Sequence, residues 1–411
     1  MTREGLSHGH VLVVSGGFEA VPGIRALVDA GFDVTVLDGD PDAPGFQLTP
    51  RRIVSSTYNA ERAATLAGRL DEVAPIDGVL SIAADVPLTV ATIQDRLALP
   101  GQTVEDARIA TDKVAMKQRF EETGVPTSWF REVESLSELE RIVGNSEEFL
   151  IKPVDSRGAR GVQRLLAGGN RRAAFHHARD VSPTKRVMLE RFVHGPQLST
   201  ESLVDGDRVA TLAISDRNYE HLDRFAPYVI ENGGLLPARR YDEVADAIDE
   251  LVLRTARALG VERGVVKGDV VWTVEGPVMI EAAPRVSGGW LATDQVPLAT
   301  GESLIVHAAR LARGDRLPKR LTRPTFAQAV CVRYFFPPSG RINSIEGVDE
   351  LREEPWVQRL ELFVEPGERV PDVTDHTKRA GLVLVTGEDR EQALERALKS
   401  VERVRFVVEP C

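Results

Sequence analysis

Short apolar segments alternate with helical patterns through the first hundred residues, and this alternation restricts the fold more than any other feature. The apolar segments are "HVLVVSGG", "DVTVLDGD" and "DGVLSIA". Each is followed by apolar residues at helical spacing, in "EAVPGIRALVDAGF", in "NAERAATLAGRLDEV" and from about Asp85 to Leu97. Strands that alternate with helices predict a parallel sheet with crossover connections. Residues 1–108 are therefore predicted to form a Rossmann-like α/β domain.

The turn after the first strand argues against dinucleotide binding. Its sequence, "SGGFEAVPG", does not match G-x-G-x-x-G, and Pro22 stands where the backbone would have to approach the ligand closely. Asp38, at the end of the second strand, is the one residue that favours a dinucleotide site. A site for a small substrate at the strand ends is the favoured use of this domain, and a nicotinamide oxidoreductase is the weaker alternative.

Composition excludes several classes of function. A chain of 411 residues exceeds the size of one compact core. A net charge of -11 argues against a surface that coats nucleic acid, because phosphate backbones require clustered cations. The two cysteines, Cys331 and Cys411, match neither a disulfide framework nor a zinc site. No segment resembles a signal peptide or a membrane span, so a cytoplasmic protein without nucleic-acid or membrane partners is predicted.

The pattern changes after Thr111. An amphipathic helix in "TDKVAMKQRFEETGVP" ends at Gly124, and mixed strands and helices follow. Residues 109–325 are predicted to form a central α+β domain, and the family resemblance described below implies a lid subdomain at about 128–203. Residues 326–411 are predicted to form a small α+β cap.

The segment "KPVDSRGARGV", Lys152 to Val162, combines a lysine at the end of a strand with a loop closed by glycines. Glycines allow backbone N–H groups to turn toward an anion, and Arg157 and Arg160 add positive charge. The segment lacks the G-K-[ST] of a Walker A loop. Taken alone, it is more typical of an ordinary surface hairpin than of a phosphate lid.

Other polar residues favour function when they are taken together. Lys113 begins a helix, and the apolar strand "MLERFV" precedes Gly195. The segment "GDVVWTVEGPVMIEAAPR" predicts an antiparallel hairpin in which Asp269 and Glu281 could face each other. Two carboxylates inside a sheet require a cation, and Mg²⁺ prefers oxygen ligands. Arg285 could clamp a transferring phosphoryl group.

In this order, Lys113, the Lys152 loop, "ERFVHG" and "IEAAPR" resemble the ATP-grasp superfamily, and the resemblance covers nearly the whole chain. The phrase "GVVKGDVVWTVEGPVMIEAAPRVSGGW" is most similar to L-amino-acid ligases and carbamoyl-phosphate-synthetase-like members. The resemblance implies ATP and Mg²⁺ as cofactors, with Asp269 and Glu281 as metal ligands and Arg285 and Lys152 as catalytic residues. It also implies a set of nucleotide-binding residues: Lys113, Lys152, Ser156, Arg157, Gly158, Gly161, Glu190, Arg191, Phe192, Val193 and Gln197.

Two positions depart from the family pattern. The family has E-x-N-x-R at the second metal site, whereas this chain has Ala283 in the middle position, which leaves the number of Mg²⁺ ions open. The glutamate expected to bind ribose corresponds to Gln197, or alternatively to Glu201.

The resemblance implies an ADP-forming carboxylate–amine ligase that works through an acyl phosphate, with an amino acid or a similar small carboxylate as substrate. Two alternatives remain: phosphorylation of bicarbonate or formate, as in purine-pathway relatives, and an ATP-binding protein without catalysis. Relatives also suggest a homodimer. The predicted substrate residues are Arg217, His221, Asp223, Arg224, Ser287, Gly288 and Gly289. For the first four, which stand in "SDRNYEHLDRF", a charged and solvated loop is the competing interpretation.

Overall fold

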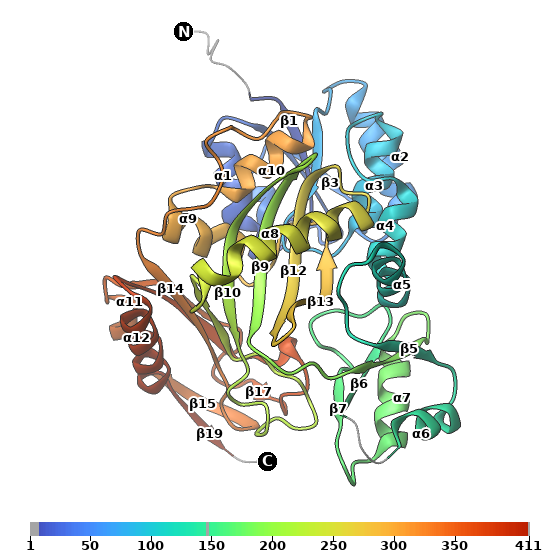
Figure 1. The fold of residues 1–411 in the computed structure, drawn as a ribbon. Coiled ribbons are helices and arrows are strands. Elements are labelled where there is room, and N and C mark those ends of the chain that lie inside the picture. The colour runs from blue at the N-terminus through green and yellow to red at the C-terminus, as the bar shows by residue number, and fades with distance from the viewer. Residues whose placement is uncertain (1–7, 145–147, 410–411) are drawn as a thin grey trace.

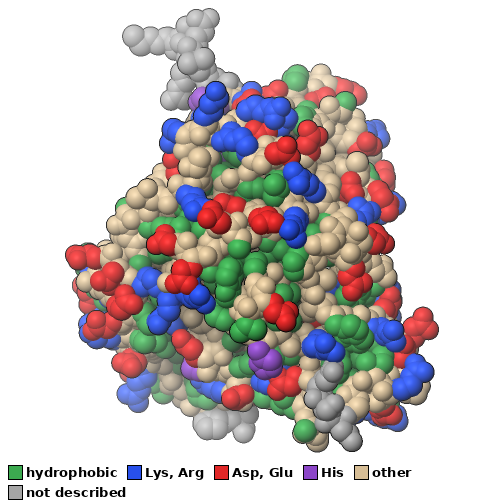
Figure 2. Space-filling view, in the orientation of Figure 1, with side chains coloured by type: hydrophobic (Ala, Val, Ile, Leu, Met, Phe, Trp, Pro, Cys, Tyr) green, Lys and Arg blue, Asp and Glu red, His purple; other side chains and the backbone are tan. Residues whose placement is uncertain are grey.

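The computed structural model describes residues 8–144 and 148–409. Figure 1 presents three units around one long sheet: an N-terminal unit at the top, a lid at the lower right and a C-terminal unit at the lower left. Cys331 is buried, and Cys411 lies outside the described residues. Within the described ranges, no helix has the length and apolar character needed to cross a membrane. Figure 2 shows acidic and basic side chains intermingled over one face of the molecule.

The N-terminal unit contains the predicted parallel sheet, in the order β3-β2-β1-β4. All side chains of its central strand are buried, as expected for a parallel sheet covered on both faces. Its elements are β1 (His10–Val14), α1 (Val21–Asp29), β2 (Asp33–Asp38), β3 (Arg51–Val54), α2 (Ala60–Asp71), β4 (Gly78–Ser81), α3 (Pro87–Arg96) and α4 (Val104–Thr111). Helix α4 crosses residue 108, the predicted end of this unit.

The lid is a four-stranded antiparallel sheet, in the order β5-β8-β6-β7, with two helices packed on it. The chain enters it through α5 (Lys113–Thr123). Its elements are β5 (Phe130–Val133), α6 (Leu136–Val143), β6 (Phe149–Pro153), β7 (Gln163–Leu165), α7 (Arg171–Val181) and β8 (Val187–Arg191). The predicted lid extends too far, to about residue 203, because the next strand joins the large sheet. The alternation in "QLSTESLV" fits either sheet, so the sequence does not identify the partner strand.

The large sheet has eight strands in the order β13-β12-β9-β10-β11-β14-β18-β16. They are β9 (Gln197–Asp205), β10 (Arg208–Asn218), β11 (Gly233–Leu236), β12 (Arg263–Thr273), β13 (Gly276–Ala283), β14 (Ala329–Phe335), β16 (Val357–Leu362) and β18 (Gly381–Gly387). Helix α8 (Tyr241–Ala258) crosses one face of this sheet (Figure 1) and buries Val244, Ile248 and Leu251 against it. On the other side, α9 (Val296–Thr300) and α10 (Leu304–Ala312) share a hydrophobic core with the N-terminal sheet.

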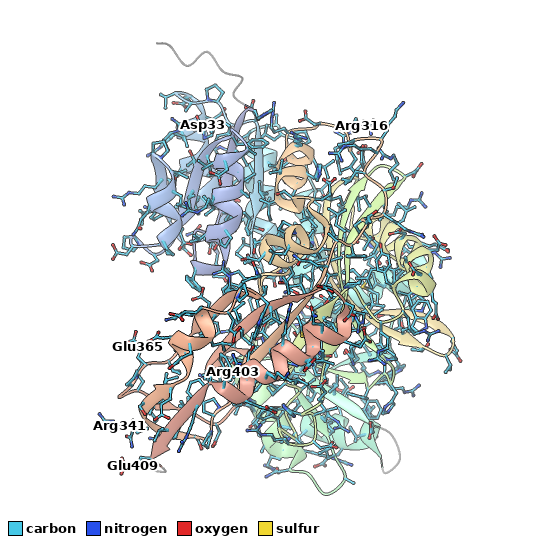
Figure 3. All side chains as sticks on the ribbon, turned by 90° about the vertical axis from the view of Figure 1, so that its left-hand side faces the viewer. Asp33, Arg316, Arg341, Glu365, Arg403 and Glu409 are labelled. Atoms are coloured by element: carbon cyan, nitrogen blue, oxygen red, sulfur yellow. The ribbon has the colours of Figure 1, made fainter. Side chains whose placement is uncertain are left out.

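The C-terminal unit continues the large sheet, because β14, β16 and β18 extend it at one side. Its remaining elements are β15 (Gly340–Glu346), α11 (Val348–Arg352), β17 (Arg369–Val370), α12 (Arg390–Arg403) and β19 (Arg405–Glu409). Strands β17, β15 and β19 form a small second sheet, and its free end lies at Arg341 and Glu409, far from the N-terminal unit (Figure 3).

Candidate active site

A cavity of about 260 Å³ separates the lid from the large sheet. Eight basic side chains and four acidic ones line it, an excess of positive charge in a chain whose net charge is -11. The basic residues are Lys113, Lys152, Arg157, Arg160, Arg191, Arg217, Lys267 and Arg285, and the acidic residues are Asp85, Glu190, Asp269 and Glu281. Such an excess favours a polyanionic ligand.

Lys152 extends from β6 toward the side chain of Glu190 on β8, and the two form an ion pair. Lys117 of α5 contacts the same carboxylate at 2.6 Å, and both Lys117 and Glu190 are only 1% exposed. Burial alone would raise the pKa of Glu190, but the two lysine cations outweigh burial and lower it. From the sequence, residues 190–193 are predicted to contact adenine. In the structure, the Glu190 side chain instead pairs with Lys152 and holds it in place.

Lys117 is a residue that the sequence analysis missed. It lies three residues after Val114 and three before Phe120, so it shares their buried helix face. A lysine between two apolar residues at this spacing indicates a buried cation, which requires an acidic partner.

The loop between β6 and β7 lies at the edge of the cavity. Ala159, Gly158 and Gly161 have positive φ angles, and a Cβ atom at Gly161 would approach Pro153 to 2.8 Å. Because of this close approach and the positive φ angle, glycine is required for the loop to turn over the cavity at residue 161. The loop is also held by Lys113, whose Nζ donates to the carbonyl of Ser156 at 2.7 Å.

The same loop contacts both of the other units. The Arg157 guanidinium donates to the Tyr58 hydroxyl and lies 3.9 Å from the Asp85 carboxylate, both in the N-terminal unit. The carbonyl of Gly158 accepts from the backbone N–H of His376, in the C-terminal unit. The loop thus lies over the cavity with contacts on both sides.

The segment after β8 forms the opposite wall. Arg191, Phe192, Val193 and Gln197 all line the cavity, together with apolar residues of β12 and β13. Within the described residues, the backbone N–H of Val193 makes no hydrogen bond, so it is available to a ligand. Gln197 lines the cavity and Glu201 does not, so Gln197 is the better placed of the two predicted ribose ligands.

Asp269 and Glu281 are direct neighbours on the paired strands β12 and β13, and both line the cavity. Asp269 Oδ1 contacts Arg217 at 2.7 Å and Lys267 at 2.5 Å, while Glu281 lies 3.3 Å from Lys113. Burial raises the pKa of Asp269, but Arg217 and Lys267 outweigh it and lower the pKa to about 2. Two adjacent carboxylates fit a Mg²⁺ ion that takes its other ligands from phosphate and water.

Arg285 follows β13 and lies between two cavities. Its Nε is 3.5 Å from the carboxylate of Asp85, which follows β4 of the N-terminal unit. Burial opposes ionisation of Asp85, but Arg285 and Arg157 lower its pKa, so the carboxylate keeps its charge. Arg285 is therefore oriented by the N-terminal unit.

The second cavity, of about 600 Å³, adjoins the first and shares Arg217, Lys267 and Arg285 with it. The predicted substrate residues Arg217, Ser287, Gly288 and Gly289 all line it. His221, Asp223 and Arg224 line neither cavity: His221 packs against Phe225 and Phe336, Asp223 is fully exposed, and Arg224 donates to the Phe336 carbonyl. A charged loop in sequence does not reveal which of its side chains turn inward.

Two further residues of the second cavity were not predicted. Glu19 accepts a hydrogen bond from the Gly289 backbone N–H at 2.8 Å, and no cation pairs with it in the part of the chain that the structure describes. Arg379 lies 3.7 Å from the centre of the Tyr334 ring and has no carboxylate partner among the described residues. They come from opposite ends of the chain, and neither belongs to a motif.

Glu201 lies outside both cavities and is fully buried on β9. Neither of its carboxylate oxygens meets a hydrogen-bond partner among the described residues. Burial raises the pKa of Glu201 to about 7, and the nearby Ser287, Lys267 and Arg285 oppose this increase without cancelling it. A buried carboxyl of this kind is uncharged in mildly acidic solution.

The chain is similar to two family models and to several known proteins. Residues 110–289 match the family model of the ATP-grasp domain, and residues 333–409 match the model of L-amino acid ligase C-terminal domain 2. The uncharacterized protein y4rH of Sinorhizobium fredii is 29% identical over 348 residues, which cover 81% of this chain and 69% of that protein. A D-alanine–D-alanine ligase of Gloeobacter violaceus is 27% identical over 300 residues, 71% of this chain and 87% of that protein. The crystal structure of an L-amino acid ligase from Bacillus licheniformis superposes with a TM-score of 0.81 at 20% identity, over 98% of this chain and 100% of that one.

Proposed function

We propose that the chain, whose residues 110–289 match the ATP-grasp domain, is a carboxylate–amine ligase that joins a small carboxylate to the amine of an amino acid, with release of ADP and phosphate. One observation supports this proposal above the others. A cavity with an excess of basic residues lies beneath a glycine-containing loop and opens toward a second cavity with unpaired charges of both signs. A nucleotide and a zwitterion can therefore lie side by side.

ATP in the first cavity would place its phosphates toward Lys113, Lys152 and Arg285. The adenine would lie on the segment after β8, where the Val193 N–H is available and apolar residues flank the ring. Asp269 and Glu281 would hold Mg²⁺, which when bound neutralises phosphate charge and polarises the transferring group. These assignments make the predicted nucleotide-binding residues part of one site.

The reaction requires the protein mainly to position its substrates. A substrate carboxylate attacks the γ-phosphorus and ADP leaves; an amine then attacks the acyl phosphate and phosphate leaves. Arg285 lies at the junction of the two cavities, where its guanidinium can stabilise charge on the phosphoryl oxygens. The loop over the cavity excludes water, which would otherwise hydrolyse the acyl phosphate.

Glu19 and Arg379 support an amino acid as the occupant of the second cavity. A carboxylate and a guanidinium without charged partners match the ammonium and the carboxylate of a zwitterion, and charge-assisted hydrogen bonds are stronger than neutral ones. Leu291 and Phe363 line the same cavity and suit an apolar side chain.

Incubation of the protein with ATP, Mg²⁺ and pools of amino acids tests the proposed function. We expect phosphate release together with a product whose mass equals that of two substrates less one water. Phosphate release with bicarbonate or formate alone would instead indicate a carboxylating or formylating enzyme. ATP binding without release of phosphate in any pool would contradict catalysis of this reaction.

Variants of the two unpaired residues test the second cavity. Glu19→Gln and Arg379→Gln should each raise the KM for the amino acid by about 10–100-fold, since hydrogen bonds to charged groups contribute roughly 1.5–3 kcal/mol. The KM for ATP should stay constant, because neither residue lines the first cavity. Arg352→Met, at an exposed helix position, is the matched control. Equal changes in both KM values would contradict the assignment.

A further inference from the structure

Lys267 and Ala283 are direct neighbours on the paired strands β12 and β13, two residues from the pair Asp269 and Glu281. Residues two apart on a strand point to the same face, so these four side chains form one patch. Lys267, Asp269 and Glu281 line the first cavity, whereas Ala283 is only 7% exposed. The patch thus holds two carboxylates, one lysine and one methyl group.

The Lys267 ammonium is held within this patch. Its Nζ lies 2.5 Å from Asp269 Oδ1, and the side chain is 15% exposed. Arg217 contacts the same oxygen at 2.7 Å, but it also pairs with Glu231 at 2.6 Å. The methyl group of residue 283 lies beside the lysine stem, because neighbouring Cβ atoms across a strand pair are only about 5 Å apart, and it offers no metal ligand there.

The patch offers few oxygen ligands for metal ions. In the described residues, no group of three or more Asp, Glu, His or Cys side chains gathers in a metal-binding arrangement. Glu201, the other carboxyl near Lys267, is fully buried and lies outside the cavity. Two carboxylates and the nucleotide phosphates suit one Mg²⁺ ion, and a second ion would have to share them.

We propose that the Lys267 ammonium is a fixed cation of the phosphate site, and that the protein therefore binds a single divalent ion with its nucleotide. This inference rests on the proposed role of the first cavity in ATP binding. Lys267 reaches both cavities, so its charge lies where the terminal phosphate would meet the substrate carboxylate. A lysine is a compact point charge suited to phosphate oxygens.

Counting metal ions tests this inference without an activity assay. The full-length protein is mixed with the methylene analogue of ATP and titrated with Mn²⁺, and the free Mn²⁺ is measured by electron paramagnetic resonance. We expect one tightly bound Mn²⁺ per chain in the nucleotide complex. Two bound ions would overturn the inference while leaving ATP binding intact. Failure to bind the analogue would overturn both the inference and the proposed function.

Variants of the same patch provide an independent readout. Lys267→Met should weaken binding of the analogue by about tenfold or more, because it removes a charged contact to phosphate. Lys267→Arg should restore most of that loss, and Lys399→Met, which removes an exposed lysine on α12, should leave affinity unchanged. The double variant Lys267→Ala/Ala283→Asn should bind a second Mn²⁺. Equal affinities of Lys267→Met and Lys399→Met would overturn the inference, and the wild-type ion count decides the matter if a variant fails to fold.

Discussion

Replacing Lys152 with methionine should lower turnover by about a thousandfold, the effect expected when a fixed cation is removed from a developing phosphoryl charge. Lys152 lies at the end of β6, beside the loop that covers the first cavity. Its partner Glu190 would keep an ion pair with Lys117, so the buried carboxylate would not be left without a cation. We therefore expect the variant to fold.

The measurement is phosphate release under saturating substrates, together with thermal unfolding of the same preparation. Lys319→Met, at an exposed position, is the control for loss of a lysine charge. A Lys152→Met variant that is folded and turns over at a rate near that of the control would contradict the assignment of the first cavity to ATP phosphates.

Glu201 should make the wild-type protein lose stability as the pH rises from about 4.5 to about 7. The unfolded chain releases the proton of this carboxyl near its ordinary pKa of 4.5, whereas the folded protein retains it until a pH of about 7. Between these values the folded state binds more protons, so raising the pH favours the unfolded state. A difference of this size corresponds to about 3 kcal/mol of unfolding free energy above pH 7.

The comparison is with Glu201→Gln, which keeps the size and polarity of the side chain but does not ionise. Denaturant unfolding is measured at a series of pH values. The unfolding free energy of the variant should rise relative to that of the wild type up to about pH 7, and the difference between the two should stay constant above that pH. Glu365→Gln, at an exposed position, is the control for loss of a carboxylate. If the difference in unfolding free energy between the wild type and Glu201→Gln does not change with pH, the uncharged, buried state of Glu201 is contradicted.

Patterns that are local in sequence predict local structure well in this chain. Alternation of strand and helix predicts the parallel N-terminal sheet, and the hairpin that pairs Asp269 with Glu281 follows from two strands joined by a tight turn. The order of Lys113, the Lys152 loop and "IEAAPR" predicts an ATP-grasp domain, and residues 110–289 match the family model of that domain. In each case, the residues that come together are close in sequence, or they stand in the motif order of a known family.

Features that depend on distant contacts are not predictable in the same way. Glu19 and Arg379 are separated by most of the chain, and only the folded structure brings them to one cavity. Membership of β9 in the large sheet, and not in the lid, depends on which strand edge is available. The partner of Lys152 was also missed, because Glu190 stands in a strand whose backbone was expected to provide the ligand contacts.

The continuous eight-stranded sheet limits how this protein can be re-engineered. Strand β11 pairs with β14 through four residues on each side, so backbone hydrogen bonds, in addition to the connecting chain, join the C-terminal unit to the rest. Removing it, or exchanging it for the same unit of a relative, would expose the edge of β11 and create an aggregation-prone surface unless the register were kept. A change of substrate preference is therefore better sought by replacing individual side chains of the second cavity than by exchanging domains.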